Sequence, residues 1–329
     1  MNVAGECSSP NDPRYSQPYS VFVFNAGGCG GCEFEVLSLF LHSQQSEGFR
    51  CKFVSQPESA DLILLFGSLN REAYQVLKAF FPRFNPSCQR LAVGACAIAG
   101  TMFQSAGWIA ATCSGTAQGL PHAFNSSWQN PIQEFSPNLY VAGCPPTPED
   151  IWQGLHRLAC CGSRLSAEAS QGVETNRIEF HSEFCLGCGL CQQICPAQAI
   201  RLSIAQELAV GEAGSILVEF NQAACLFCSL CEQLCPTGCL KLSGSGTLIR
   251  QRPQEFVVRG CLSLVRCLNC QGWMVAMPKD FIKQTLGSLP DQRWLELCPT
   301  CRKIASARYL KTAAEGLQHL HQLIQERGC

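Results

Sequence analysis

The feature that most constrains what this chain can fold into is a cysteine-rich run that occurs twice. The run CLGCGLCQQICP (185–196) is followed by CLFCSLCEQLCP (225–236), and both have the spacing C-x-x-C-x-x-C-x-x-x-C-P. The similarity continues beyond the two prolines, where AQAIRL follows the first run and TGCLKL follows the second. Residues 177–242 therefore contain an internal duplication.

This spacing is typical of the loops that bind cubane [4Fe-4S] clusters. Cysteines at i, i+3 and i+6 wrap one cluster, and the fourth cysteine of the run, before the proline, ligates the other cluster. On this rule the first set is Cys185, Cys188, Cys191 and Cys235, and the second set is Cys195, Cys225, Cys228 and Cys231. Cys239 lies outside the run, and we expect it to be a packed thiol.

Two zinc sites, or unused thiols, are the alternatives to this interpretation. Zinc sites usually take two C-x-x-C pairs or histidines, not four cysteines in one run that occurs twice. Residues 177–242 resemble the two-cluster bacterial ferredoxins. The resemblance implies an α+β domain, placed at 177–249, whose two clusters lie side by side and conduct single electrons.

Composition limits the classes of protein to consider. A chain of 329 residues is expected to form two or three domains, and its 25 cysteines, several in C-x-x-C pairs, indicate metal rather than disulfides. The net charge of −1 gives no support to nucleic-acid binding, and the low share of charged residues, 15%, favours large protein contacts. The first twenty residues hold no apolar signal region, and no run approaches 18 apolar residues. We therefore expect a cytoplasmic protein, either free or peripheral on the cytoplasmic face of a membrane complex.

Between a polar arm (1–19) and a linker (162–176), residues 20–161 alternate short apolar runs with helical patterns. The predicted strands are 21–26, 51–56, 61–68, 90–95 and 138–143. The predicted helices are 33–45, 71–81 and 148–161. This order favours a mostly parallel, flavodoxin-like α/β sheet with helices on its faces.

Four cysteines of this region follow predicted strands. Cys29 and Cys32 lie in the glycine-rich loop GGCGGCE, Cys96 follows RLAVGA, and Cys144 follows NLYVAG. Ligands of open α/β sheets gather at the carboxyl ends of the strands, so four thiolates there suit a third [4Fe-4S] cluster. A thioredoxin-like redox pair at Cys29 and Cys32, with Cys96 and Cys144 as buried thiols, is the alternative.

Three motifs in residues 20–160 carry a resemblance. GGCGGCEFEVL, GACAIAGTMF and VAGCPPTPEDIWQGL resemble, in order and spacing, the small subunit of energy-converting, complex I-related [NiFe] hydrogenases of the formate hydrogenlyase type. The resemblance implies that Cys29, Cys32, Cys96 and Cys144 hold the proximal cluster and face a large catalytic subunit. The C-x-x-C loop is similar to the hydrogenase branch, since the related complex I subunit has adjacent cysteines.

Two further points follow from the resemblance. Glu35 matches an acidic position beside the cluster loop, where it serves either proton movement or, as a carboxylate near a helix N-terminus, the helix dipole. Small subunits of the membrane-bound branch usually end soon after the GCPP segment. Here a ferredoxin unit follows, as in the cofactor-reducing soluble hydrogenases, which leaves the donor or acceptor open.

A third cysteine group lies in the C-terminal region, residues 250–329, which ends in a helical pattern at 309–326. Two C-x-x-C pairs separated by 27 residues provide the candidate ligands Cys267, Cys270, Cys298 and Cys301. Such pairs fit a tetrahedral zinc site, and a fourth iron–sulfur cluster is the alternative. Cys261 could replace one of the four.

No catalytic set appears in the sequence: the six histidines are scattered, and the chain has neither a P-loop nor a dinucleotide fingerprint. We therefore expect an electron-transfer subunit of an oxidoreductase complex, relaying single electrons through three [4Fe-4S] clusters. Its partners would be a [NiFe]-hydrogenase-like large subunit and other electron-transfer or membrane subunits. The alternatives are a ferredoxin-like carrier whose N-terminal domain only docks partners, and a quinone-linked non-hydrogenase subunit.

Overall fold

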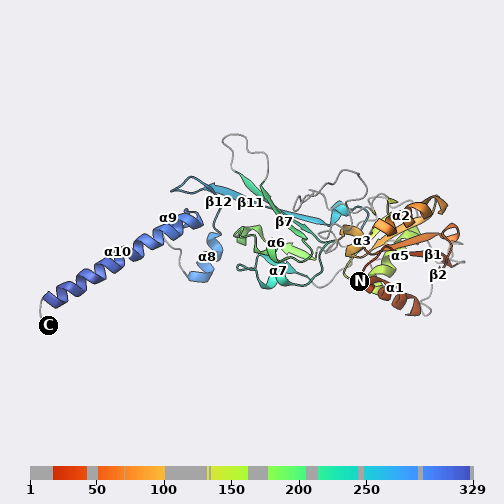
Figure 1. The fold of residues 1–329 in the computed structure, drawn as a ribbon, viewed down its shortest axis with the longest axis horizontal. Coiled ribbons are helices and arrows are strands. Elements are labelled where there is room, and N and C mark those ends of the chain that lie inside the picture. Colours follow the sequence, from red (N-terminus) through yellow and green to blue (C-terminus); the bar gives the residue numbers. More distant parts are fainter. Residues whose placement is uncertain are drawn as a thin grey trace.

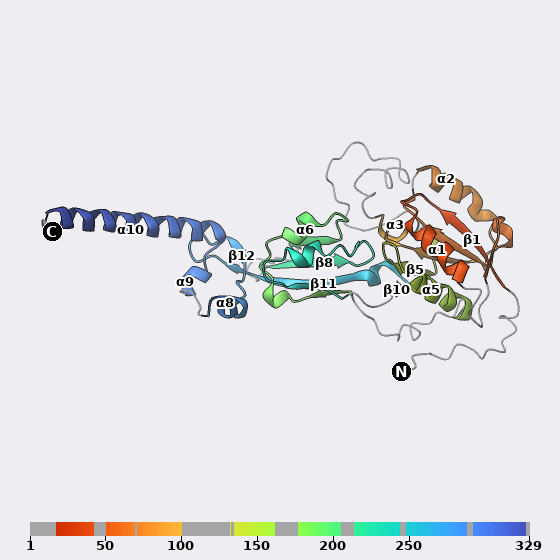
Figure 2. The ribbon, with the colours of Figure 1, turned by 90° about the horizontal axis from the view of Figure 1, so that it is seen from below.

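A computed structural model shows the fold of the chain (Figure 1). It describes residues 18–42, 51–69, 71–100, 132, 135–161, 177–204, 214–243, 248–287 and 292–326. The predicted linker and nearly all of the predicted N-terminal arm lie outside these residues. The described parts follow one another along a line, from an α/β domain, through a middle part, to a long C-terminal helix (Figures 1 and 2).

The α/β domain is built on one sheet, which has six strands within the described residues, in the order β10-β5-β4-β3-β1-β2. The strands are β1 (Tyr19–Asn25), β2 (Cys51–Phe53), β3 (Leu62–Phe66), β4 (Gln89–Val93), β5 (Leu139–Ala142) and β10 (Leu248–Arg250). The first five pair in parallel, in the order 2-1-3-4-5 of flavodoxin-like folds. The predicted fold class is thus confirmed.

Helices cover both faces of this sheet. Helices α1 (Gly31–His42) and α5 (Pro148–Cys161) share one apolar core with the sheet, while α2 (Arg71–Phe80) and α3 (Ala95–Ala99) share the other. Every residue of β3, with sequence LILLF, is buried. Such an unbroken apolar run is typical of a central parallel strand, which is covered on both faces.

The middle part contains the duplicated runs. Two short helices, α6 (Leu190–Ile194) and α7 (Leu230–Gln233), follow the two cysteine loops, and β6 (Ile178–Phe180) pairs with β9 (Leu240–Leu242). A second sheet has the order β12-β11-β8-β7. Its strands are β7 (Ile200–Ile204), β8 (Ser215–Asn221), β11 (Val257–Arg266) and β12 (Trp273–Val275).

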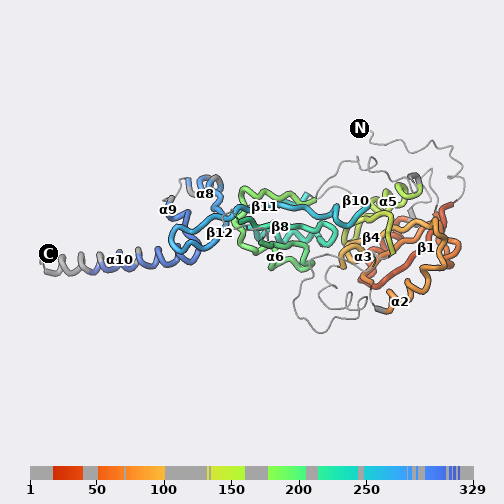
Figure 3. Tube along the Cα trace, turned by 90° about the horizontal axis from the view of Figure 1, so that it is seen from above, coloured from red at the N-terminus to blue at the C-terminus, as the bar shows by residue number. Residues whose placement is uncertain are grey.

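The remaining elements are short turns and the C-terminal helices. The 3-10 helices are η3 (Pro57–Ser59), η4 (Phe81–Arg83), η7 (Ser182–Phe184) and η8 (Pro253–Phe256). The C-terminal helices are α8 (Lys279–Leu286), α9 (Gln292–Leu295) and α10 (Pro299–Glu326). Helix α10 extends away from the rest of the described chain (Figure 3). In the part of the chain that the structure describes, no helix combines the length and apolarity needed to cross a membrane.

The segment after the second cysteine run ties the middle part to the α/β domain. Strand β10 pairs antiparallel with β5 and extends the first sheet, whereas β11 pairs with β8 and extends the second. Leu248 and Phe256 are completely buried in the core of the α/β domain, together with Ala223 from the second half of the repeat. The sheets therefore do not follow the domain boundary that we expected at residue 249.

Arg177 forms a second connection between the two parts. Its guanidinium lies 3.6 Å from the carboxylate of Asp150 in α5, and both side chains are largely buried. The same guanidinium lies over the ring of Phe227, in the loop between Cys225 and Cys228, at 4.9 Å from the ring centroid. One cation thus holds a cluster-binding loop against the α/β domain.

Replacing Arg177 with Met should destabilise this junction, because Asp150 would remain buried without its counter-charge. Removing one partner of a buried pair costs about 3 kcal/mol or more, and we expect a loss of this size in the free energy of unfolding. Arg259→Met is the matched control, since Arg259 pairs with Glu219 from an exposed position, and such a pair contributes at most about 1 kcal/mol. Denaturant titrations under anaerobic conditions, followed by circular dichroism, measure the free energy of unfolding of both variants. Equal losses of this free energy in the two variants would contradict a stabilising role of the buried ion pair.

Candidate metal centres

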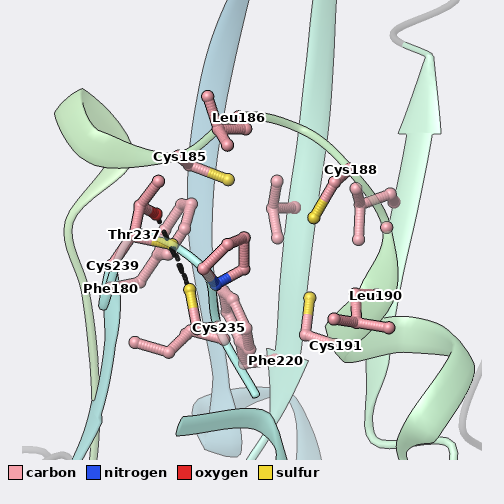
Figure 4. Close-up of a pocket in the computed structure, with 15 residues that line it drawn as sticks. Phe180, Cys185, Leu186, Cys188, Leu190, Cys191, Phe220, Cys235, Thr237 and Cys239 are labelled. Atoms are coloured by element: carbon pink, nitrogen blue, oxygen red, sulfur yellow. Dashed lines mark hydrogen bonds between the residues drawn. The ribbon is translucent and has the colours of Figure 1, made fainter. Parts of the chain in front are cut away.

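The first predicted set of cysteines surrounds one pocket (Figure 4). Cys185, Cys188 and Cys191 line it from the first run, and Cys235 lines it from the second run. Their sulfur atoms point into the same space, which is otherwise lined mainly by apolar side chains such as Phe180. The structure therefore brings together a ligand set that is not contiguous in sequence.

The second predicted set also comes together. The pKa of Cys225 is raised to about 12, mainly by burial and in addition by negative charge on Cys231, Cys195 and Cys228. Cys231 likewise interacts with Cys195 and Cys228. Cys195 thus crosses from the first run into the set formed by the second run, as Cys235 does in the opposite direction.

The two halves repeat their backbone as well as their sequence. In each loop a backbone N–H donates to the first cysteine sulfur, from Gly187 to Cys185 at 3.4 Å and from Phe227 to Cys225 at 3.3 Å. Both donors have positive φ, although Phe227 is not a glycine. The loop geometry, which the metal site requires, thus overrides the usual preference of a bulky side chain for negative φ.

The four dispersed cysteines meet at one edge of the first sheet. Cys29 and Cys32 lie where β1 leads into α1, Cys96 lies in α3 after β4, and Cys144 follows β5. The pKa of the Cys32 thiol is raised to about 12, mainly by burial and in addition by the nearby thiolates of Cys96, Cys144 and Cys29. Cys29 and Cys144 are exposed, so this set opens onto the surface of the chain.

Gly94 allows the backbone to approach this set closely. It has a φ of +89°, and its amide and that of Ala95 donate to Val141 and Gly143, which joins the ends of β4 and β5. A Cβ atom at Gly94 would lie 2.5 Å from the Cys32 sulfur. The site thus depends on glycine at this position.

Each of these sets fits an iron–sulfur cluster. Four partly buried thiolates repel one another, and burial adds to the cost of their charge, so a positively charged centre is needed to hold them together. Cubane clusters held by four cysteine thiolates provide such a centre and carry one electron at a time. The donor sets, all sulfur, agree with this class of cofactor.

Packing contacts show which cysteine sets lie next to one another in space. Ala99, three residues after Cys96, belongs to a buried cluster with Ala197, Ala199 and Ala224, and the predicted ligands Cys195 and Cys225 pack against this cluster. Two residues of the second set thus lie beside the end of the helix that carries Cys96. On the far side, a Cβ atom at Gly187, in the loop of the first set, would touch Val275 of β12.

The C-terminal candidates are also brought together. The sulfur atoms of Cys267, Cys270, Cys298 and Cys301 all lie within 4.8 Å of one another. Backbone N–H groups of Cys270 and Cys298 lower the pKa of Cys267 to about 6. Cys261 lies exposed in β11 and is not part of this group.

One position differs from what the sequence suggested, and another, the packed thiol Cys239, makes a contact that the sequence did not indicate. Glu33, and not Glu35, is the acidic residue in the first turn of α1, where it accepts a hydrogen bond from the Asn25 amide at 3.0 Å. Cys239 is buried, and its sulfur lies 3.5 Å from that of Cys235. The sequence does distinguish Cys239, because Ala199 occupies the matching position in the first half of the duplication.

Comparison with protein families identifies both parts. Residues 29–158 match the family described as NADH ubiquinone oxidoreductase, 20 Kd subunit, and residues 184–239 match the 4Fe-4S dicluster domain. The first match contains the dispersed cysteines, and the second contains both cysteine runs. The resemblance found in the sequence motifs is thereby confirmed.

Three relatives illustrate the similarity. A probable membrane-bound hydrogenase subunit of Pyrococcus furiosus is 27% identical over 41% of this chain and 70% of its own length. Formate hydrogenlyase subunit 7 of Escherichia coli is 27% identical over 41% of this chain and 46% of its own length. A subunit of the NADH-quinone oxidoreductase of Desulfovibrio desulfuricans is 28% identical over 40% of this chain and 61% of its own length. The chain thus shares its α/β part with subunits of hydrogenase and complex I type.

Gly94→Ala should remove the metal centre of the dispersed set and leave the two ferredoxin centres, because the new Cβ would collide with Cys32. We expect the iron content to fall from about twelve to about eight atoms per chain, as for the loss of one cubane of three. Gly287→Ala is the control, since Gly287 also has positive φ but open space around it. Iron analysis of both variants checks this; an unchanged iron content for Gly94→Ala would contradict it.

Proposed function

We propose that this chain, which joins an α/β domain of the NADH ubiquinone oxidoreductase 20 kDa subunit family to a 4Fe-4S dicluster domain, is the electron-transfer subunit of a multisubunit oxidoreductase. It relays single electrons between a large catalytic subunit of [NiFe]-hydrogenase type and an external donor or acceptor. The chain itself supplies cluster ligands and no catalytic set.

The observation that carries the proposal is the packing of Ala99, which follows Cys96 in α3, into a buried cluster against which Cys195 and Cys225 also pack. Ala99 belongs to the short helix that carries Cys96, and it packs against the loop that carries Cys225. Small, buried side chains thus lie between the helix that carries Cys96 and the residues Cys195 and Cys225. Close packing without intervening solvent is what a path for electrons between them requires.

Three sets of cysteines define the order of the centres along this path. Cys29, Cys32, Cys96 and Cys144 hold the first centre, at the exposed edge of the α/β sheet. Cys195, Cys225, Cys228 and Cys231 hold the second, and Cys185, Cys188, Cys191 and Cys235 hold the third. When bound, the clusters supply one-electron oxidation and reduction; the backbone N–H groups of the loops donate to the thiolates and tune the potentials.

The exposed side of the first centre is where we place the large subunit. Phe34 and Leu37 of α1 expose 72% and 47% of their surface beside the loop of Cys29 and Cys32. Large apolar side chains around an exposed redox centre favour a protein interface that excludes water. Membership of such a complex would also place the chain peripherally on the cytoplasmic face of a membrane, by analogy with the membrane-bound hydrogenase relative.

The combined substitution Cys96→Ala and Cys144→Ala tests this function. In the complex purified with its large subunit, reduction through the partner's active site should no longer reach the ferredoxin clusters, while a small chemical reductant should still reduce them. The iron content should fall by about four atoms per chain. Electron paramagnetic resonance follows the reduction of each cluster.

The matched control replaces two other thiols of the same domain, Cys51 and Cys88, with Ala; this variant should keep all clusters and normal reduction. Unchanged spectra and iron content in the Cys96, Cys144 variant would show that these residues are not ligands. The chain would then be a ferredoxin-like carrier whose N-terminal domain only docks partners.

A further inference from the structure

The C-terminal cysteine group differs in geometry from a cluster-binding set. Its four sulfur atoms lie within 4.8 Å of one another, and those of Cys270 and Cys298 are 3.7 Å apart. Within the described residues it is the one group of cysteine, histidine or carboxylate ligands gathered closely enough for a single ion. The close ligand spacing therefore distinguishes this group from the twelve cysteines of the three predicted cluster sets.

The spacing distinguishes one metal ion from a cubane. Zinc–sulfur bonds of about 2.3 Å in a tetrahedron place neighbouring sulfurs about 3.8 Å apart. Thiolates that bind four separate irons of a cubane lie farther apart, because the cluster core stands between them. The separation of Cys270 and Cys298 matches the single ion.

The group is also arranged as a closed tetrathiolate site. One pair, Cys267 and Cys270, lies in the turn between β11 and β12, and the other, Cys298 and Cys301, lies at the start of α10. The backbone N–H of Cys298 donates to the Cys267 sulfur at 3.2 Å. The amide of Asn269 donates to the Cys301 sulfur at 3.3 Å. These donors offset the negative charge of four thiolates around a divalent ion.

We propose that Cys267, Cys270, Cys298 and Cys301 bind one zinc ion, which joins the β11–β12 hairpin to helix α10 and carries no electrons. Tetrahedral sulfur sites take zinc or iron, and zinc binds more tightly than ferrous iron in the series of divalent metals. The buried core around the site consists of Cys267, Met274 and Cys301, so the bound metal replaces a hydrophobic core.

The site also bears on the electron path. Gly187, in the loop of Cys185 and Cys188, packs so closely on Val275 that a Cβ atom there would lie 2.5 Å from that side chain. Val275 lies in β12, directly after the zinc-binding turn. The zinc ion thus supports the strand on which the last ferredoxin loop rests, and the path for electrons ends at that loop.

Metal analysis of the full chain, purified anaerobically, tests the proposal directly. We expect one zinc per chain in addition to the cluster iron. The variant Cys298→Ser with Cys301→Ser should lose the zinc and keep the iron, while the control Cys261→Ser should keep both. If the double variant does not fold, the ratio of zinc to protein in the unaltered chain still shows whether the chain binds one zinc ion.

Two results would overturn the proposal. The first is an unaltered chain without stoichiometric zinc. The second is a double variant that loses iron, by one atom for a mononuclear iron site or by about four for a cluster. Neither result depends on the relay function, because the twelve cluster cysteines are unchanged in these proteins.

A separate observation concerns Cys239, which shares a pocket with the first ferredoxin set (Figure 4). Its sulfur lies 3.5 Å from the ligand Cys235, and its side chain is 3% exposed. The Thr237 hydroxyl is also near the Cys235 sulfur, at 3.7 Å. In the first half, Ala199 occupies the equivalent position and offers Cys195 only its backbone N–H, at 3.3 Å. The two ferredoxin sites thus differ by one thiol placed against a ligand.

We infer that Cys239 is a positioning residue whose S–H group donates to a ligand thiolate of the first set, Cys185 or Cys235, and raises the reduction potential of the cluster held by that set. The inference rests on the proposed ferredoxin clusters. A hydrogen bond to a ligand sulfur stabilises the more negative, reduced cluster, so the potential rises. The cluster farthest from the α/β domain would then be the better electron acceptor of the two.

Redox titration of the full chain, followed by electron paramagnetic resonance, tests this inference. Cys239→Ala gives both halves the same residue and should lower one of the two ferredoxin potentials, which brings them closer together. Cys239→Ser keeps a donor and should retain most of the difference. Unchanged potentials in Cys239→Ala, or a loss of about four irons that shows Cys239 to be a ligand, would overturn it. Absence of cluster signals in the unaltered chain would instead contradict the proposed function.

Discussion

The mutual repulsion of closely placed thiolates is the constraint on which the rest of this structure depends. Each predicted site gathers four cysteine sulfurs in partly buried surroundings, where burial and the neighbouring thiolates together raise the pKa values of Cys32 and Cys225 to about 12. Such groups are stable together only around a positive centre. The folds of all three parts of the chain therefore have to satisfy the coordination of metal as well as the packing of apolar side chains.

The connection between the domains serves the same requirement. Strand β10 extends the first sheet, and Phe256 inserts into its core, so that the duplicated region cannot turn freely against the α/β domain. Arg177 adds a buried ion pair with Asp150 and a contact with Phe227. These interactions hold Ala99 against the loop of Cys225. The spacing between the dispersed cysteines and the second cysteine run is thus set by ordinary packing between the two parts.

Much of the fold could be predicted from the sequence because its signals are local. The five parallel strands and helices α1, α2 and α5 lie within a few residues of their predicted ranges, since unbroken apolar runs and helical periodicity show burial directly. The duplicated run defined two ligand sets, because cysteines at i, i+3 and i+6 belong to one loop. Strand β10 was not predicted. It is three residues long, and its pairing with β5 and the burial of Leu248 and Ile249 in the core stabilise it.

The sequence by itself thus determined the donor atoms and the loops that carry them: all-sulfur ligand sets at fixed short spacings. Only the tertiary structure decided which site lies next to which, because the order of the sites depends on contacts such as those of Ala99, between residues about a hundred positions apart. The tertiary structure also places the Cys239 sulfur 3.5 Å from that of Cys235, and the Cys270 sulfur 3.7 Å from that of Cys298. Spacing along a chain limits what one loop can bind, whereas distances between loops follow from packing.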